Sequence, residues 1–438
     1  MQKKDKKMAS KSNLSIVIDI GTSKIVGLAG QKTEDEKIEI RGISKVSSRG
    51  IKRGVVFNIG EAAASLSELV SDLQRQTQEK ITSAAVTFAG QHIKTESYSA
   101  CRFTSEGGIV TAFDVNELYN EAQNIKVEND YSIMHVIPQC YIIDDDIREM
   151  NPVGIAGRKL EAQYRLLVVP SAHIVNLQRV FDQAGIAIEN ITLSPVAIAE
   201  ATLSDDEKEI GSIMLDIGAG TTKLAVYFES ILVHVAVIPF GGNVVTRDIK
   251  EGCSILPKWA EQLKVKYGEA LGDLADEQKV VTIPGHNGWE PKEITFKSLA
   301  FIIQARLEEI IDNVNYQIGK SGVEDQLGSG IVVSGGTANL NNIISMIKFR
   351  TGMDARKAFP VILPVNRKKE FQDQELLNAL GMLKLSLKNR NVAVNEKIKK
   401  KKEKKVKEKE SSGFHYFQKV IQGVINYIDD ENDDLSMN

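Results

Sequence analysis

Short apolar runs alternate with longer amphipathic stretches along most of the chain. The runs have the length and composition of buried strands, whereas the stretches between them space their apolar residues as helices do. The clearest runs are Ser15–Ile20, Ala84–Phe88, Tyr164–Val169, Ser212–Ile217 and Gly330–Val333. Alternating strands and helices predict an α/β fold, which we expect to extend from about residue 14 to about residue 385.

The pattern changes near the end of the chain. Residues 397–410 read KIKKKKEKKVKEKE, which contains too few apolar residues to offset the entropy of ordering. We therefore expect a basic, extended linker over residues 387–412, and a disordered N-terminus over residues 1–13.

After this linker, apolar residues return at helical spacing and predict an amphipathic helix over residues 413–428, followed by an acidic tail over 429–438. Its apolar face consists of Phe414, Phe417, Ile421, Val424, Ile425 and Ile428. A short helix on a tether has no core of its own. We expect its apolar face to bind either a membrane surface or a groove on another protein.

Length and composition narrow the class of protein. With 438 residues the chain exceeds the size of one core, since single cores stop growing near about 250–300 residues, so we expect two or three lobes. No run approaches the roughly 20 apolar residues of a spanning helix. The charged first residues lack the apolar stretch of a signal peptide, so we expect a cytoplasmic protein.

Charge and cysteine content exclude further classes. The net charge of −3 gives no general nucleic-acid footprint, and we expect no nucleic-acid partner. Cys101, Cys140 and Cys253 have neither CxxC spacing nor neighbouring histidines, which argues against a disulfide framework and a zinc site.

Two similar strand–turn–strand segments carry candidate chemistry. IVIDIGTSKIVGL (Ile16–Leu28) is an apolar strand that ends in an aspartate, a glycine and small hydroxyl residues, and IMLDIGAGTTKLAVY (Ile213–Tyr227) repeats this design. Glycine lets a backbone approach a phosphate closely, and hydroxyl groups add donors. The candidate phosphate-binding residues are Asp19, Gly21, Thr22, Ser23 and Lys24 in the first copy, and Asp216, Gly218, Gly220, Thr221, Thr222 and Lys223 in the second.

One such hairpin alone is commonly no more than a turn, but two copies predict two related lobes that face one nucleotide. Asp19 and Asp216 would lie at corresponding strand ends. There they could hold Mg²⁺ through its waters, because this ion gives up its hydration shell reluctantly.

A third loop, GIVVSGGTANLNNI (Gly330–Ile343), is a buried strand followed by Gly335, Gly336 and Thr337 and then a helix. It could present backbone N–H groups to a ligand, or it could be a turn that needs glycine for steric reasons alone. Three loops in this order resemble the phosphate 1, phosphate 2 and adenosine motifs of the actin, Hsp70 and sugar-kinase superfamily. The resemblance implies ATP as the ligand.

Four further segments resemble the FtsA family of actin-like bacterial cell-division proteins. They are HVIPQCYIIDDD (His135–Asp146), NPVGIAGRKLEAQ (Asn151–Gln163), PFGGNVVTRDI (Pro239–Ile249) and AEQLKVKYGEAL (Ala260–Leu271). The similarity covers nearly all of residues 14–385.

This resemblance implies an actin-like (ribonuclease H-like) fold of two halves, with a small α/β subdomain inserted in the first. The implied ranges are 14–83 with 164–211 and about 361–386 for the first actin-like subdomain, 84–163 for the insertion, 212–240 with 329–360 for the second actin-like subdomain, and 241–328 for a helical subdomain. The resemblance also adds Gly242, Glu261 and Lys264 to the nucleotide site. Glu261 and Lys264 could instead form only a surface ion pair.

In polymerising relatives a Glu or Gln that orients water precedes the helix found here at Pro195–Leu203. This chain has Ser194 there, a poor base near neutral pH, and Glu200 could substitute only if the helix shifted. We therefore expect slow or negligible ATP hydrolysis. His135 is expected to be structural.

The implied partners are those of a division protein: other copies in a filament, the C-terminal peptide of the tubulin-like protein FtsZ, further division proteins at the insertion, and membrane lipid at the terminal helix. Arg306 is the candidate that binds the FtsZ peptide, unless it only pairs with Glu309 in its own helix. The implied location is the cytoplasmic face of the inner membrane at the division site.

One departure weakens the expectation of lipid binding, because Lys419 is the only lysine of the terminal helix and acidic residues follow it. The alternatives are an actin-like pilus-assembly protein recruited by a membrane protein, and a small-molecule kinase of the same superfamily. A chaperone ATPase is disfavoured because no substrate-binding β-domain follows.

Overall fold

The computed structural model describes residues 14–105, 107–285 and 290–388. The terminal helix predicted at residues 413–428, with its six candidate membrane-binding side chains, lies outside the described residues, as do the acidic tail and most of the linker. The body described below ends at Leu385.

The first half is built on a sheet with the strand order β11-β6-β1-β2-β3, in which β1 pairs antiparallel with β2 and parallel with β6. Its strands are β1 (Ser15–Ile20), β2 (Lys24–Lys32), β3 (Ile38–Ser47), β6 (Ser83–Phe88) and β11 (Ala187–Leu193), with a small hairpin of β4 (Ile51–Lys52) and β5 (Val55–Val56) nearby in the sequence. The predicted strands at Ser15–Ile20 and Ala84–Phe88 are confirmed.

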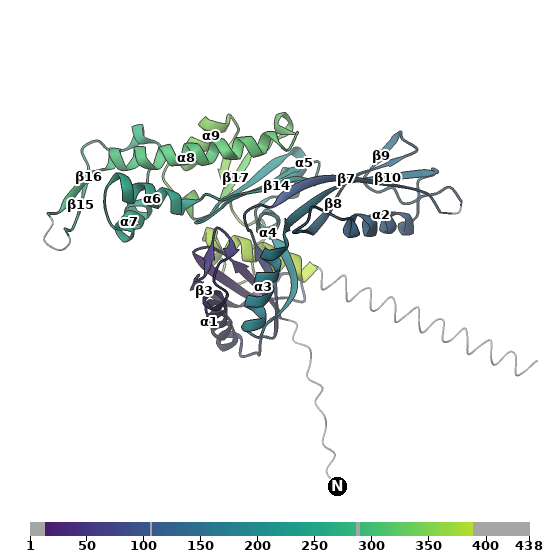
Figure 1. The fold of residues 1–438 in the computed structure, drawn as a ribbon, viewed down its shortest axis with the longest axis horizontal. Helices are drawn as coiled ribbons and strands as arrows, with labels where there is room; N and C mark the ends of the chain where they lie inside the picture. The colour runs from purple at the N-terminus through teal and green to yellow at the C-terminus, as the bar shows by residue number, and fades with distance from the viewer. Residues whose placement is uncertain (1–13, 106, 286–289, 389–438) are drawn as a thin grey trace, which may run out of the picture. The chain divides into compact units, whose positions relative to one another are not determined.

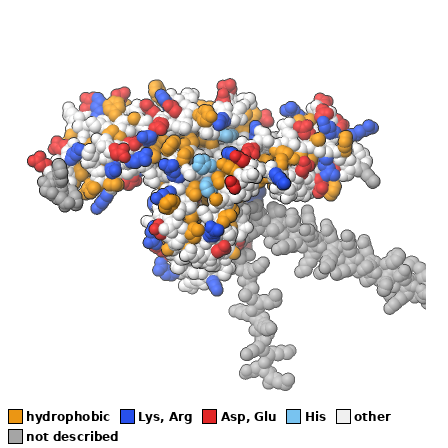
Figure 2. Space-filling model, in the orientation of Figure 1, with side chains coloured by type: hydrophobic (Ala, Val, Ile, Leu, Met, Phe, Trp, Pro, Cys, Tyr) orange, Lys and Arg blue, Asp and Glu red, His pale blue; other side chains and the backbone are white. Residues whose placement is uncertain are grey.

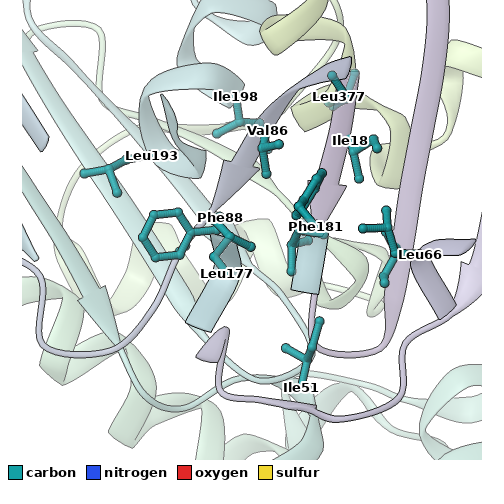
Figure 3. Close-up of a cluster of buried hydrophobic side chains, with 14 of the residues drawn as sticks. Ile18, Ile51, Leu66, Val86, Phe88, Leu177, Phe181, Leu193, Ile198 and Leu377 are labelled. Atoms are coloured by element: carbon teal, nitrogen blue, oxygen red, sulfur yellow. The ribbon is translucent and has the colours of Figure 1, made fainter. Parts of the chain in front are cut away.

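Helices α1 (Ile59–Thr77), α3 (Ser171–Gln183) and α4 (Ser194–Thr202) pack around this sheet. Asn58 caps the N-terminus of α1 by accepting a hydrogen bond from the Glu61 N–H, which satisfies a backbone donor that the helix leaves unpaired. The buried face of α1 joins a core that also contains Phe181 and Ile198 (Figure 3). Because α4 contacts strands of both halves, this core extends from one half into the other.

The second half has the order β14-β13-β12-β17-β18. Its strands are β12 (Ser212–Ile217), β13 (Thr222–Phe228), β14 (Ile231–Ile238), β17 (Ile331–Ser334) and β18 (Ala355–Lys357), and it is preceded by α5 (Asp205–Ile210). When β12 is matched with β1, the order is that of the first sheet: an antiparallel hairpin and third strand on one side, and two parallel strands on the other. The prediction of two related halves is confirmed.

A helical region is inserted in the second half between β14 and β17. It contains α6 (Gly242–Gly252), α7 (Pro257–Tyr267), α8 (Phe296–Gly319) and the hairpin of β15 (Val280–Ile283) and β16 (Lys292–Thr295), and α9 (Ile343–Thr351) follows β17. Figure 1 shows α6 and α7 beside the long α8; α6 contacts both α7 and α8. Their apolar faces share one core with the second sheet.

The insertion in the first half forms a separate sheet with the order β7-β10-β8-β9, and α2 lies along one face of it (Figure 1). Its elements are β7 (Lys94–Phe103), α2 (Ala112–Asn124), β8 (Tyr131–Ile143), β9 (Ile147–Glu149) and β10 (Lys159–Pro170). Thr111 and Asp114 form a capping box that begins α2. Tyr164, Leu118 and Ile143 belong to its own apolar core.

Both boundaries of the insertion differ from the predicted ones. The predicted range was 84–163, but residues 84–88 lie in β6 of the first sheet, and β10 continues to Pro170 within the inserted sheet. The physical reason is that both boundary segments are apolar runs. A buried central strand and the base of a long strand have the same pattern, so the sequence does not show to which sheet each belongs.

The edge strand β14 of the second sheet is covered by the insertion. The hydroxyl of Thr95 donates to the Val235 carbonyl over 2.9 Å and accepts from the Val235 N–H over 3.2 Å. The Gln139 amide donates to the Leu232 carbonyl over 3.1 Å. These side chains satisfy backbone groups that an edge strand otherwise exposes.

The remaining short helical turns are η1 (Gly272–Leu274), η2 (Glu324–Gln326), η3 (Gly336–Asn339), η4 (Glu370–Gln372) and η5 (Gln374–Leu376), and residues 377–388 are helical. Among the described residues, no helix is both long and apolar enough to cross a membrane. Acidic and basic side chains are interspersed on the face drawn in Figure 2.

Candidate functional site

The strand ends that carry the predicted motifs meet at one cavity of about 490 Å³. The turns after β1, β12 and β17 supply one part of its wall, and α6, α7 and residues 374–378 supply much of the rest. Of the predicted nucleotide-site residues, the structure brings all except Thr222 to this wall: Asp19, Gly21, Thr22, Ser23, Lys24, Asp216, Gly218, Gly220, Thr221, Lys223, Gly242, Glu261, Lys264, Gly335, Gly336 and Thr337. Thr222 is instead buried and donates its hydroxyl to the Phe240 carbonyl.

The two hairpin turns are closed by equivalent backbone hydrogen bonds. The Gly21 N–H donates to the Lys24 carbonyl over 3.1 Å, and the Gly218 N–H donates to the Thr221 carbonyl over 3.0 Å. The turns also touch, because a Cβ atom added at Gly220 would lie 2.6 Å from the Thr22 hydroxyl. Only glycine allows this approach of the two halves.

Two carboxylates and one ammonium group lie together in the cavity. Lys223 donates to the Asp216 carboxylate over 2.6 Å, and Asp19 accepts from Thr87 over 2.7 Å. Burial raises the pKa of Asp19 to about 6, although Lys223 and the Thr87 hydroxyl act in the opposite direction. Burial disfavours the charged form of Lys223, but the two aspartates outweigh it and raise its pKa.

The carboxylates of Asp19 and Asp216 are suitable ligands for a hydrated magnesium ion. Two carboxylates that face one cavity can hold the ion through its waters, and the phosphates of a nucleotide would complete its shell. Within the described residues there is no cluster of three or more acidic, histidine or cysteine side chains placed to hold a metal, so these residues alone offer no full inner shell.

The third loop approaches the second hairpin closely. Gly335 has φ +92°, and a Cβ atom there would lie 2.5 Å from Asp216 Oδ1 and 2.4 Å from the Ile217 carbonyl oxygen. The sequence predicted a helix directly after this loop, but a short 3₁₀ turn, η3, comes first and α9 begins only at Ile343. The first backbone N–H groups at the cavity therefore belong to the turn.

Glu261 and Lys264 lie three residues apart on α7 and form the ion pair that the sequence suggested, with 2.7 Å between the charged atoms. Both also line the cavity. Lys264 donates to the Gly242 carbonyl over 3.0 Å and to the Thr246 hydroxyl over 2.8 Å, which connects α7 to α6. The ion pair is thus part of the cavity wall.

The candidate residues for hydrolysis do not reach the cavity. Ser194 is 1% exposed at the start of α4, and Ile198, one turn further along this helix, lines the cavity instead. Glu200 is held by Lys208 over 2.5 Å and by Lys384 over 3.0 Å, which lowers its pKa against the effect of burial.

Two further candidates have contacts elsewhere in the protein. Arg306 pairs with Glu309 in its own helix, as one alternative predicted, and also with Asp248 on α6. His135 accepts a hydrogen bond from the Leu193 N–H over 3.3 Å, and burial lowers its pKa to about 4. This arrangement agrees with a structural histidine.

Sequence reasoning missed one wall of the cavity, which residues 374–378 provide. Asn378 donates to Asp19 over 2.6 Å, and Glu375 pairs with Lys24 and with Lys45. No motif marks this segment. The available signal was a single asparagine in the apolar run LLNALGML, a pattern that predicts a buried polar side chain with a specific partner.

Comparison with known proteins identifies the family. A family model described as cell division protein FtsA matches residues 213–381, and a model of the SHS2 domain inserted in FtsA matches residues 90–168. The cell division protein FtsA of Neisseria meningitidis is 32% identical over 78% of this chain and 83% of its own length. The chain belongs to the FtsA family.

Further FtsA relatives agree with this assignment. FtsA of Escherichia coli is 30% identical over 76% of this chain and 81% of its own length, and FtsA of Bacillus subtilis is 30% identical over 87% of this chain and 85% of its own. Membership of this family shows a role in cell division, and it decides against the small-molecule kinase and chaperone alternatives. The SHS2 match covers nearly all of the inserted sheet, whose last strand ends two residues later at Pro170.

Solved structures support the fold alone. A PilM–PilN type IV pilus biogenesis complex aligns with a TM-score of 0.58 at 14% identity, covering 85% of this chain and 98% of the other. MreB5 of Spiroplasma citri bound to ADP aligns with a TM-score of 0.52 at 15% identity, covering 88% and 99%. The predicted actin-like fold with an inserted subdomain is confirmed.

Proposed function

We propose that this FtsA-family chain binds ATP with Mg²⁺ in the cavity, assembles with other copies, and links FtsZ to the cytoplasmic face of the membrane at the division site. The observation that carries the nucleotide proposal is the meeting of two matched hairpins and the Gly335 loop at one cavity. The similarly folded MreB5 of Spiroplasma citri was crystallised with bound ADP, which supports the same class of ligand.

The cavity residues divide into groups with different roles. Backbone N–H groups of the two turns and of η3 would hold phosphate oxygens, and Asp19 and Asp216 would hold Mg²⁺ through water. Glu261 and Lys264, on the wall contributed by α7, would contact the ribose and the base. The ion neutralises phosphate charge when bound.

Hydrolysis should be slow. A water-orienting group must reach the γ-phosphate, and Ser194 is buried away from the cavity while Glu200 is held by two lysines. ATP would then act chiefly as a ligand that joins the two halves. A turnover rate like that of the sugar kinases would contradict this expectation.

Calorimetric titration with MgATP tests the nucleotide proposal. Replacement of Lys264 by Ala should weaken binding by about tenfold or more, equivalent to about 1.4 kcal/mol, because the helices that form the wall lose their link at Gly242. Lys250→Ala is the matched control, since Lys250 lies on α6 but not on the cavity wall. If the unaltered chain shows no binding, the nucleotide proposal is wrong.

Cosedimentation with anionic liposomes and ATP tests the tether. The full chain should pellet and carry purified FtsZ with it, because assembly places many weakly binding terminal helices on one membrane surface. A chain truncated after Asn395 lacks the predicted helix and should stay in solution. If neither form pellets, the terminal helix docks on a protein instead. The partner-recruited arrangement of the pilus-assembly proteins would then be the better proposal.

Arg306 remains a proposed contact for the FtsZ C-terminal peptide, on α8 of the helical region. It has acidic partners inside the chain, so an acidic peptide would have to compete with Asp248. Arg306→Ala should weaken peptide binding, while Arg350→Ala, which removes another paired arginine near α8, should not. Equal effects of both changes would argue against a specific role.

A further inference from the structure

Asn378 connects the C-terminal part of the body to the first phosphate hairpin. Its amide donates to Asp19 Oδ1 over 2.6 Å although the two residues are 359 positions apart in the chain. Asn378 is only 5% exposed and lines the cavity. The contact therefore belongs to the site rather than to the outer surface.

Two neutral donors hold the same oxygen of Asp19. Thr87, on the parallel strand β6, donates to Oδ1 over 2.7 Å, and Asn378 donates to it from a different segment. Two hydrogen bonds from different elements fix both the position and the rotation of a carboxylate, which is how an outer shell of residues orients a metal-binding group.

The corresponding aspartate of the second half is held in a different way. Asp216 lies opposite Lys223 in its hairpin and forms a close ion pair with it, whereas Asp19 lies opposite Val26. Lys223 directly neutralises Asp216. Asp19 accepts hydrogen bonds from two uncharged groups, so a cation in the cavity would not have to displace an ammonium group from hydrogen-bonding contact with it.

The position of Asn378 leaves one of its polar atoms in an unfavourable environment. Its Oδ1 atom is buried and has no hydrogen-bond partner among the described residues. A buried acceptor without a partner destabilises a fold, and an apolar side chain at this position of the apolar run would avoid that. The presence of an amide at residue 378 therefore points to a role in the site rather than in packing.

We propose that Asn378 is a positioning residue that orients Asp19 for magnesium-dependent binding of the nucleotide. This inference rests on the proposed nucleotide function and extends it to the C-terminal segment of the body. Because Asn378 acts through Asp19, its effect should appear in the contribution of Mg²⁺ to affinity and not in the affinity for the nucleotide alone.

The test compares ATP dissociation constants measured with Mg²⁺ and with EDTA. In Asn378→Ala, the factor by which Mg²⁺ tightens ATP binding should fall about tenfold, which is the usual effect of losing an outer-shell partner. The EDTA value should change less than about twofold, because ATP alone does not need the oriented carboxylate. A merely structural role would weaken both values equally.

Asn366→Ala is the matched control, because the Asn366 amide also connects the C-terminal part of the body to the first sheet, through the backbone of Ile40, but does not line the cavity. Its magnesium factor should equal that of the unaltered chain. The inference is overturned if Asn378→Ala keeps the full magnesium factor, or loses affinity equally in both conditions, while the unaltered chain binds MgATP. If the unaltered chain binds no ATP at all, the proposed nucleotide function fails and the inference fails with it.

Discussion

Two adjacent glycines in the loop after β17 have different roles. Gly335 has φ +92°, and the backbone of Ile217 occupies the place of its missing Cβ. Gly336 lines the same cavity, but a Cβ atom there would meet nothing within 4 Å. The first glycine is therefore required by the fold, and the second by the space that a ligand would need.

Replacement of Gly335 by Ala should destabilise the chain by about 2 kcal/mol or more, since it combines an unfavourable backbone conformation with a backbone clash. Gly336→Ala should leave stability nearly unchanged and weaken ATP binding. Urea unfolding without nucleotide separates the two effects. Similar stability losses in both variants would contradict this assignment.

The lowered pKa of His135 should make the stability of the chain depend on pH. Its folded pKa is lowered from 6.5 to about 4 by burial, so between these values the unfolded chain binds a proton that the folded chain does not. The contribution of neutral His135 is fully present above about pH 6.5 and decreases as the pH falls toward 4. Between pH 7 and pH 5 this contribution should fall by about 2 kcal/mol, measured in urea as the difference between the unaltered chain and His135→Gln, because the raised pKa of Asp19 changes the total stability in the opposite direction over this interval.

His173 and His234 also have lowered pKa values, mainly through burial, so the control for this prediction must isolate one histidine. His135→Gln provides it, because an amide cannot titrate in this range. The variant should lose less stability over the same interval. An unchanged pH profile would show that His135 does not cause the effect.

At the scale of elements, the sequence was most informative where local chemistry and strand pattern coincide. The hairpins at Asp19 and Asp216 each combine an apolar strand with glycine and hydroxyl residues, and these features specify their turn without help from the rest of the fold. Asn378 and Glu375 contact the first hairpin only because the tertiary fold brings the C-terminal segment beside it. A local sequence pattern does not predict such a long-range contact.

The limits of the inserted subdomain were missed for a related reason. Residues 84–88 and 164–170 are apolar in either sheet, and only strand pairing assigns them. The position of Ser194 was predicted correctly at the start of a helix, but its burial was not, since burial depends on packing between α4 and both sheets.

The crossing of α4 with the helix that begins at residue 377 yields a prediction about packing. A Cβ atom at Gly381 would lie 1.7 Å from the Ala197 carbonyl oxygen, so Gly381→Ala must push the two helices apart. We expect a loss of about 2–3 kcal/mol in urea unfolding, although alanine favours helices over glycine.

Gly60→Ala in α1 is the control for this change, because the nearest atom to a Cβ there is 3.6 Å away. It should be neutral or slightly stabilising. If Gly381→Ala were equally harmless, the close crossing of the helices would not exist in solution.

At the scale of the whole body, the insertion connects the two halves by a further route, besides the cavity and the apolar core around α4. It belongs to the first half by sequence, yet Thr95 and Gln139 bond the edge strand β14 of the second half. β14 pairs with β13, which pairs in turn with β12, the strand that carries Asp216. A change in the position of the insertion would therefore act on the sheet that supports one side of the proposed nucleotide site.

Thr95→Val tests this connection, because valine keeps the shape of threonine and leaves both polar groups of Val235 without their partner. The loss of stability should be about 1–3 kcal/mol. Hydrogen exchange should accelerate in β14 as well as in β7. Thr104→Val is the matched control, since the Thr104 hydroxyl bonds Gly157 within the insertion, and it should accelerate exchange there alone. If β14 responds equally to both changes, the insertion transmits disturbances through its whole core and not through the Thr95 contact.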